Sequence, residues 1–452
     1  MIPDALSDWL QKLHPRTRKI GKNILESAVY RAISMAASFI TVPILLHWLG
    51  QAEYGVWLTM QAVIGWFLIF DLGLGNGLRN KLAEALAANN PQLARRYVSS
   101  AYVIITGISL AMLVLYGIAQ WFIDWKVVFN APEINDSELR RTMNLVFLFF
   151  CVQFVFQLIK MIWLADQRPA LTTLVNALGT LFSLVAVFLA SKLLPANLEI
   201  VAWIIGGGNL LLLVIANFTG FRGKYKSFRP SVKLASWDEM RKLTNLGLRF
   251  FILQGAALIV FATDNMIITQ MIGPEEVPAY QIAFKYFNLV MVFFTLITVP
   301  YWSAYTEAFQ KKDHAWIRST VRSLMRIWAV SLAVVMIMFV SAPVIYRLWV
   351  GPELQIPTML SAVFAIWVAL SAGLAIYGNF LSGVGKIQLS VYHAIFVSII
   401  NIPLSILLAG PLGLGSTGVI LASVIGLIPR AIFQPIQYHL IIKGKARGIW
   451  NR

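Results

Sequence analysis

Residues 220–243, GFRGKYKSFRPSVKLASWDEMRKL, form the longest basic connection in the chain and divide an apolar sequence into two halves. Seven of its side chains are Lys or Arg, whereas long apolar stretches precede and follow it. Those stretches have about 20 to 28 residues each, and a helix needs about 20 residues to cross a hydrocarbon core of roughly 30 Å. We therefore expect this segment to link two groups of membrane-spanning helices.

Six apolar stretches lie on each side of the linker. The composition agrees with a membrane protein, because 58% of the 452 residues are hydrophobic and 13% are charged. No soluble domain could remove that much apolar surface from water. The predicted spans are residues 24–49, 54–78, 97–123, 142–165, 170–191, 198–219, 244–271, 278–302, 323–345, 355–379, 387–410 and 417–441.

The positive charges predict the orientation. Of the 37 Lys and Arg residues, 26 fall in the two ends of the chain and the loops on the same side, 5 fall in the opposite loops and 6 lie within spans. Cytoplasmic loops carry the excess of Lys and Arg, so both termini are predicted to be cytoplasmic. The net charge of +17 is explained by this topology, and we expect no nucleic-acid partner.

The predicted organisation has five parts, and the fold class is an all-α polytopic membrane protein with 12 transmembrane helices. The parts are a cytoplasmic interfacial segment (1–23), an N-lobe (24–219), the cytoplasmic linker (220–243), a C-lobe (244–441) and a cytoplasmic basic tail (442–452). The single cysteine, Cys151, lies in an apolar run and excludes an internal disulfide.

A weak repeat relates the two lobes. When the chain is offset by 223 residues without a gap, both copies run from an outside turn through a helix and an amphipathic segment into the next helix. We therefore predict two six-helix lobes related by a pseudo-two-fold axis along the membrane normal, with a substrate cavity at their interface. The matching residues are Gly50, Glu53, Phe70, Glu84, Ala85, Arg95, Val98 and Ser100, which meet Gly273, Glu276, Phe293, Glu307, Ala308, Arg318, Val321 and Ser323.

The first span carries a polar stripe at helical spacing, which includes Arg31. The stripe predicts either one wall of a cavity or a face that packs against another helix. A guanidinium within the membrane needs an anion or water, and its fork of donors suits a phosphate. The stripe residues that we assign to the cavity are Ser27, Ser34, Ser38 and Thr41, with Gln254 of the seventh span.

The seventh and eighth spans contain further ionisable side chains. Arg249 is a candidate for the cationic cavity, although it could instead extend to the interface. Asp264 and Lys285 lie at similar predicted depth, so they could form an ion pair. Alternatively, Asp264 binds a coupling ion, H⁺ or Na⁺, and Lys285 joins the cationic cavity. We expect Lys160, Arg326 and Arg430 to reach toward the interface.

No catalytic or metal-binding pattern appears in the sequence. His47 and His393 have no second ligand at metal spacing, and we predict no metal site and no resident cofactor. A Walker motif, a nucleophile elbow and a paired His and carboxylate are absent. The chain is therefore predicted to be a transporter and not an enzyme.

Three motifs resemble a known family. They are Leu49-Gly50-Gln51-Ala52-Glu53-Tyr54-Gly55-Val56-Trp57, then Asp71-Leu72-Gly73-Leu74 with Arg79-Asn80-Lys81, and Pro300-Tyr301-Trp302-Ser303-Ala304-Tyr305. Together they resemble the Wzx-type O-antigen and exopolysaccharide flippases of the multidrug, oligosaccharidyl-lipid and polysaccharide exporter superfamily. The resemblance in layout covers essentially the whole chain.

The resemblance implies a function and a location. A flippase of this kind moves an undecaprenyl-diphosphate-linked oligosaccharide from the cytoplasmic to the periplasmic leaflet of the bacterial inner membrane. It does so by alternating access through a central cationic cavity, for which Arg31, Arg249 and Lys285 are the candidates here. Membrane lipids, a glycan polymerase and a chain-length regulator are the implied partners in polysaccharide biosynthesis.

Three other functions remain open from the sequence. A cation-coupled multidrug exporter of the same superfamily would be favoured by an acidic cavity. A membrane-bound glycan polymerase or ligase would need a sizeable outside loop, and residues 124–141 are the only long one. A purely structural scaffold is supported by hydrophobicity alone.

Overall fold

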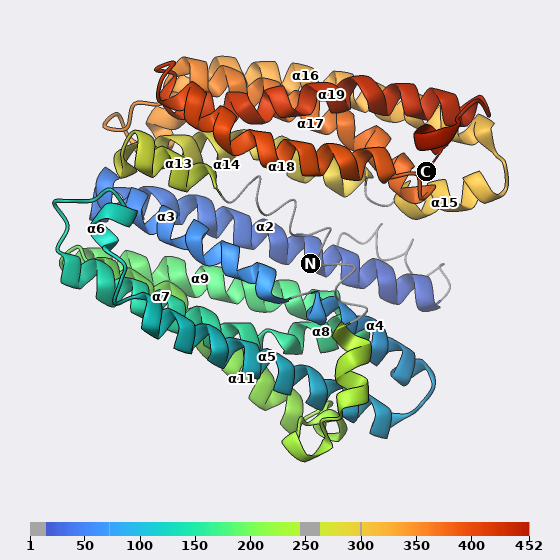
Figure 1. Ribbon diagram of the computed structural model, residues 1–452, viewed down its shortest axis with the longest axis horizontal. Helices are drawn as coiled ribbons and strands as arrows, with labels where there is room; N and C mark the ends of the chain where they lie inside the picture. The colour runs from blue at the N-terminus through green and yellow to red at the C-terminus, as the bar shows by residue number, and fades with distance from the viewer. Residues whose placement is uncertain (1–14, 72, 245–262, 299–300, 452) are drawn as a thin grey trace, which may run out of the picture. The chain divides into compact units, whose positions relative to one another are not determined.

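The computed structural model describes residues 15–71, 73–244, 263–298 and 301–451, and in these ranges the chain forms helices and turns without any strand (Figure 1). The α-helices are α2 Pro15–Leu49, α3 Gln51–Trp66, α4 Leu74–Ala87, α5 Pro91–Ala119, α6 Trp125–Val128, α7 Asp136–Phe156, α8 Leu158–Ala165, α9 Pro169–Leu193, α10 Leu198–Ala202, α11 Gly208–Arg222, α13 Asp264–Met271, α14 Val277–Thr298, α15 Tyr301–Gln310, α16 His314–Val350, α17 Thr358–Gly383, α18 Gln388–Ala409 and α19 Gly415–Ile442.

Ten helical segments in the described ranges are long and apolar enough to cross a membrane. This finding confirms an all-α, polytopic membrane protein. Of the remaining predicted spans, residues 244–271 fall mostly outside the described residues. The predicted second span, 54–78, is wrong in its extent: α3 ends at Trp66, a 3₁₀ turn follows, and Gly73 with a φ of 69° precedes α4. The left-handed conformation of Gly73 changes the direction of the chain, and hydropathy alone does not reveal this change.

The chain forms two compact units, which are described here one at a time. Unit 1 comprises Met1–Gly50, Phe67–Val128 and Pro132–Gly255, and unit 2 comprises Gln51–Trp66, Phe129–Ala131 and Ala256–Arg452. The contacts of α3 therefore group it with unit 2, although the sequence assigned it to the N-lobe. The lobe boundaries themselves stay a prediction.

Unit 1 is built on helices that pack over much of their length. α2 lies along α9, and α7 packs against both α5 and α11. An aromatic cluster fills part of this core: the ring of Phe147 stacks on Tyr116 at 4.1 Å and meets Phe67 edge-on at 5.0 Å. Such pairs stabilise a core beyond the area that they bury.

Unit 2 centres on α14, α17 and α19, with α16 against α17 and α18 against α19. Its core near the start of α15 contains Phe294, Tyr305, Phe380 and Tyr438, all buried. α3 approaches this unit very closely, because a Cβ atom on Gly55 would lie 1.6 Å from the carbonyl oxygen of Pro274. Only glycine allows that approach of two backbones.

The turns before α5 and α16 share one local structure at the sequence offset of 223 residues. Asn89 and Lys312 have φ values of 49° and 58°, which are unusual for residues with a side chain. Asn90 and Asp313 follow, and each side chain accepts a hydrogen bond from the backbone N–H three residues later, at 3.0 and 2.9 Å. The backbone N–H of each also donates to the carbonyl five residues earlier. The repeat therefore extends from sequence to backbone geometry.

Candidate functional site

Unit 2 contains a cavity of about 470 Å³ between α14, α17 and α19, beside the start of α13. Its walls are largely apolar, with Phe284, Met291 and Trp367 among them. The polar side chains that line it are Asp264, Tyr280, Gln281, Asn288, Ser371 and Arg430. Apolar walls with a few convergent polar groups are typical of small-molecule and ion sites.

The face that α14 turns to the cavity follows from helical spacing. Gln281, Phe284, Asn288 and Met291 recur every three or four residues and all line the cavity. Residues at that spacing share one side of a helix. The neighbouring Phe287 and Val290 are buried in the packed part of the unit, so α14 divides cleanly into a core face and a cavity face.

Asp264 is the acidic group of the cavity. Its side chain is 7% exposed, and the hydroxyl of Tyr280 donates a hydrogen bond of 2.6 Å to its Oδ2 atom. The Oδ1 atom is buried and has no hydrogen-bond partner among the residues that the structure describes. An oxygen in this state can bind a proton, or it can join other oxygen atoms around a hard cation.

A second set of hydrogen bonds fixes the surroundings of Asp264. The amide of Gln281 donates to Asn265 Oδ1 at 2.6 Å, and the amide of Asn265 donates to the carbonyl oxygen of Leu58 at 3.3 Å. The hydroxyls of Thr59 and Thr269 share a hydrogen bond of 2.7 Å nearby on the same helices. These contacts join α3, α13 and α14, so the position of the carboxylate is set by three helices.

Arg430 is the basic group of the cavity, and sequence reasoning misjudged it. The sequence suggested that it reaches to the interface, but the structure places it on the cavity wall. Its buried Nε atom has no partner in the described part of the chain. Gly378 of α17 leaves it room, because a Cβ there would lie 2.9 Å from Arg430 Nη2. The glycine was visible in the sequence, but its contact with α19 was not.

The two charged groups lie at different depths. The ring of Tyr280, the partner of Asp264, lies 5.1 Å from that of Phe364, whereas Arg430 lies beside Gly378. Fourteen residues of α17 separate Phe364 from Gly378, which corresponds to about 20 Å of helix. The cavity is therefore elongated, with an acidic and a basic end.

Lys285, the other candidate of the C-lobe that the structure describes, is not paired with Asp264. The partner of Asp264 is Tyr280 and not Lys285, so the ion pair considered from the sequence does not form. Lys285 is half-buried on α14 and is not among the residues that line the cavity. Arg249 and Gln254 lie outside the described residues.

The polar stripe of α2 belongs to unit 1, and it contains both side chains that pack inside the unit and an exposed side chain. Ser34 shares a hydrogen bond of 2.9 Å with Thr180 of α9, and Thr41 donates to the carbonyl oxygen of Ala37. Ser27 and Ser38 are half-buried, whereas Arg31 is exposed at the surface of the chain. Part of the stripe thus packs on α9, and Arg31 stays accessible.

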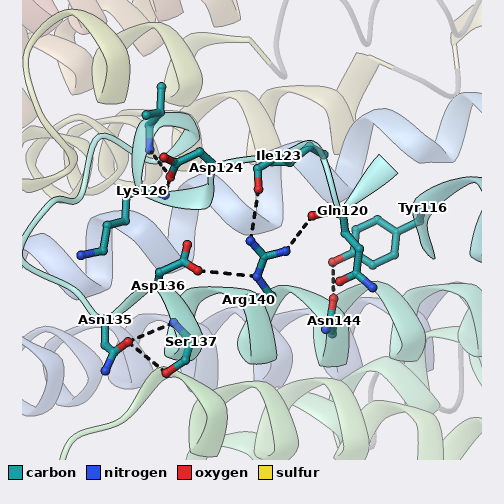
Figure 2. A network of polar contacts seen from close by, with 11 residues as sticks. Tyr116, Gln120, Ile123, Asp124, Lys126, Asn135, Asp136, Ser137, Arg140 and Asn144 are labelled. Carbon is teal, nitrogen blue, oxygen red and sulfur yellow. Dashed lines mark hydrogen bonds and ion pairs between the residues drawn. The ribbon is translucent and has the colours of Figure 1, made fainter. Parts of the chain in front are cut away.

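The connection between α5 and α7 in unit 1 is held by Arg140 of α7, as Figure 2 shows. The guanidinium donates to the carbonyl oxygens of Gln120 at 2.6 Å and Ile123 at 3.4 Å, and lies 3.6 Å from Asp136. Asp124 accepts hydrogen bonds from the next backbone N–H groups. The charged groups at this end of the loop are therefore occupied with its own structure.

The isolated histidines make local contacts. His47 is 2.7 Å from the carbonyl oxygen of Pro43, and His393 is 2.9 Å from that of Gly426. Within the described residues, no three His, Cys, Asp or Glu side chains gather where they could hold a metal ion.

Comparison with known proteins adds the family. A model of the polysaccharide biosynthesis protein family matches residues 20–306, and a MatE model matches residues 252–407. A Yersinia pseudotuberculosis protein named for O-antigen export is 22% identical over 79% of this chain and 82% of its own length. A Salmonella typhi protein named as an O-antigen transporter is 22% identical over 67% of this chain and 64% of its own length.

Solved structures show the same fold. An inward-facing multidrug resistance MATE transporter aligns with a TM-score of 0.76 at 14% identity, over 93% of this chain and 98% of its own. An outward-facing MATE transporter aligns with a TM-score of 0.63 at 15% identity, over 94% and 96%. The family model covers well over half of the residues. The chain therefore belongs to the polysaccharide biosynthesis protein family, as a membrane transporter of the multidrug, oligosaccharidyl-lipid and polysaccharide exporter superfamily.

Proposed function

We propose that this protein flips an undecaprenyl-diphosphate-linked oligosaccharide from the cytoplasmic to the periplasmic leaflet by alternating access. The relatives named for O-antigen export support the substrate class. The observation that carries the transport mechanism is Asp264, a carboxylate buried within a membrane protein whose Oδ1 atom has no partner beside a cavity. Buried charge of this kind is costly in a membrane and marks a working site more often than a packing contact.

The diphosphate head is the difficult part of the substrate to move. Its charge cannot enter hydrocarbon without replacement of its water, whereas the lipid tail can stay in the bilayer. A central cationic cavity would supply that replacement, and Arg31, Arg249 and Lys285 are the side chains that we propose for it. The exposure of Arg31 supports its assignment, because an accessible guanidinium can offer parallel N–H groups to a phosphate.

We assign the coupling ion to Asp264. An ion can drive transport only if it binds one conformation better than the other. Asp264 and the hydrogen bonds around it lie where α3, α13 and α14 meet, so a shift of these helices would change the oxygen atoms available to a cation. Binding of H⁺ or Na⁺ would then favour one arrangement of the transporter.

The test of this function uses a bacterial strain that lacks its own copy of the flippase and makes surface glycan only when this chain is supplied. We expect Arg31→Ala to abolish surface glycan while the amount of protein in the membrane stays unchanged. Arg31→Lys, which keeps the charge but not the fork, is expected to restore part of it. Normal glycan with Arg31→Ala would remove that residue from the substrate path.

Failure of the unmodified chain to restore any surface glycan, with the protein present in the membrane, would count against the function itself. The alternative is cation-coupled export of drugs, which is favoured by the MatE match over residues 252–407 and by the acidic end of the cavity. Dye efflux from the same strain separates the two functions. A glycan polymerase gains no support, because Arg140 of the outside loop is bound to backbone carbonyls.

A further inference from the structure

A second pocket lies in unit 1, at the end of α11 that leads into the basic linker. It has a volume of about 360 Å³ and lies between α5, α7, α11 and the segment around Pro230. Its apolar wall includes Phe156, Val214 and Phe218, while Arg222 and Arg229 stand at its edge. The pocket therefore has an apolar interior and a basic rim.

The polar groups inside this pocket are already satisfied. The hydroxyl of Tyr102 donates to Asn217 Oδ1 at 2.6 Å, and the amide of Asn217 donates to the carbonyl oxygens of Phe156 and Leu213, both at 2.8 Å. The interior thus offers a ligand no polar atom that still needs a hydrogen bond. The part of a ligand that enters must be apolar.

The two arginines at the rim are exposed and point to an anion. The guanidinium carbon of Arg222 lies 3.7 Å from the centre of the Phe218 ring, so the stacked group keeps its N–H edge for a partner. Two acids near the linker are engaged elsewhere: Asp166 pairs with Lys224 and Arg168, and Glu239 lies near Arg96. In the described part of unit 1, neither Arg222 nor Arg229 has an acidic partner.

The linker is tied to unit 1 on both sides of Arg229, which holds the rim in place. Arg95 of α5 donates to the carbonyl oxygen of Arg229 at 3.0 Å, and the N–H of Ser231 donates to Ser99 Oγ at 3.1 Å. On the other side, the hydroxyl of Tyr225 donates to Asp166 at 2.8 Å. Burial, together with that hydrogen bond, raises the pKa of Tyr225, so the phenol remains a donor.

We propose that this pocket binds an anionic phospholipid of the cytoplasmic leaflet, with its phosphate between Arg222 and Arg229 and part of one acyl chain against Phe156, Phe218 and Val214. The apolar part of the pocket lies deeper in the membrane than its basic rim, because Val214 lies about 12 Å deeper along α11 than Arg222. Basic pockets between transmembrane helices on the cytoplasmic side suit such head groups. The assignment of the leaflet rests on the predicted orientation of the chain.

A phospholipid fits better than the lipid-linked glycan. The volume of about 360 Å³ holds a section of one acyl chain, and its interior offers no unsatisfied polar atom to a sugar. Anionic lipids are also abundant in the leaflet on the basic side of a membrane protein. Occupancy of this pocket would hold the linker on α5 and α11 and so stabilise unit 1.

The experiment measures lipid binding to the purified full chain by native mass spectrometry, with phosphatidylglycerol and phosphatidylcholine as probes. We expect the unmodified chain to prefer phosphatidylglycerol. The double variant Arg222→Gln/Arg229→Gln should lose roughly 10- to 30-fold in phosphatidylglycerol affinity, with phosphatidylcholine unchanged. Both residues are exposed, so the substitutions leave the core intact.

The matched control is Lys226→Gln/Lys233→Gln, which removes two exposed charges from the same linker without touching the pocket. It should change the affinity by less than about twofold. An equal loss in both double variants would mean that only general charge matters, and it would overturn the proposal. Arg222→Lys/Arg229→Lys should bind with intermediate affinity, because lysine keeps the charge without the fork.

Competition identifies the source of the phosphate. Inorganic diphosphate should not displace phosphatidylglycerol at matched concentration, because it cannot use the apolar wall. Displacement by inorganic diphosphate would indicate a site for free phosphate, and tighter binding of undecaprenyl diphosphate would assign the pocket to the transport substrate. Either result would refute the phospholipid. The proposed flippase function would survive both, since it depends on surface glycan and not on this pocket.

Discussion

The loop between α5 and α7 around Arg140 in unit 1 and the cavity around Asp264 in unit 2 place charge in an apolar protein in opposite ways. Arg140 donates to two carbonyl oxygens and lies beside Asp136, so its guanidinium is already bound by groups of the protein. Within the described ranges, Asp264 keeps one buried oxygen and Arg430 one buried nitrogen without a hydrogen-bond partner. A charged group that is hydrogen-bonded to the protein stabilises the fold, whereas a charged group that faces a cavity is available to a ligand.

Energetics give this difference its meaning. A buried polar atom without a hydrogen bond costs about 1 to 3 kcal/mol, and more when it is charged. Asp264 and Arg430 carry this cost beside a cavity, where water, an ion or a substrate can supply the missing hydrogen bond. The comparison therefore predicts that substitutions in the loop change stability, while substitutions in the cavity change transport.

The largest effect is expected from Asp264→Asn. The amide can still accept the hydrogen bond of Tyr280 but cannot carry the charge that binds a coupling ion. We expect transport to fall by roughly 5- to 150-fold, the range of typical coupling free energies. Surface glycan per amount of membrane protein measures it. Asp264→Glu should recover part of the activity, and full activity with Asp264→Asn would mean that this carboxylate is only a packing group.

The next effect belongs to the loop. Arg140→Gln removes charged hydrogen bonds to two carbonyl oxygens, so the free energy of unfolding should fall by about 1 to 3 kcal/mol. Thermal unfolding in detergent measures this loss. Arg141→Gln is the control, because its ion pair with Glu199 is exposed and worth about 0 to 1 kcal/mol. If Arg140→Gln lowered transport per folded molecule and left stability unchanged, the loop would be a working site and the comparison would fail.

A smaller effect tests whether the two ends of the cavity act on each other. If the helix rise of about 20 Å between Phe364 and Gly378 is taken as the separation of Asp264 and Arg430, the two charges interact by roughly 0.8 kcal/mol at an effective dielectric constant of about 20. Neutralising Arg430 with Gln should therefore tighten cation binding at Asp264 by roughly fourfold, because a repelling charge is removed. Titration of the fluorescence of the cavity residue Trp367 with Na⁺ or H⁺ reports this. Arg430→Lys keeps the charge and should leave the affinity nearly unchanged. Weaker binding after Arg430→Gln would contradict the predicted sign.

The smallest effect is expected at an engaged acid of unit 2. Asp313 caps α16 just as Asn90 caps α5, so an amide already serves this position in the repeat. Asp313→Asn should change the free energy of unfolding by only about 0.3 kcal/mol, whereas Asp313→Ala should cost about 1 kcal/mol. Chemical unfolding of both variants checks this. A loss of transport with Asp313→Asn, at unchanged stability, would show that acidic charge matters there for another reason.

Some of the candidate site could be predicted from the sequence. Asp264 was identified because a carboxylate within an apolar span stands out, and the cavity contains it. Lys285 stood out for the same reason, but it is not among the residues that line the cavity. Arg430 was assigned to the interface, because hydropathy gives depth along a helix and not the neighbour that faces it. The cation site proposed around Arg31 and Arg249 stays a prediction.

Length, apolar content and the alternation of charged loops determined by themselves that this chain is an all-helical membrane protein, because lipid allows few other arrangements of a hydrogen-bonded backbone. The repeat at an offset of 223 residues was also recognisable in the sequence, and the helix caps at Asn90 and Asp313 agree with it. Only the tertiary structure decided that α3 packs with unit 2, that Gly378 leaves room for Arg430, and that Asp264 meets Tyr280. The physical reason is that periodicity fixes which residues share a face of a helix, while the packing of several helices fixes what that face meets.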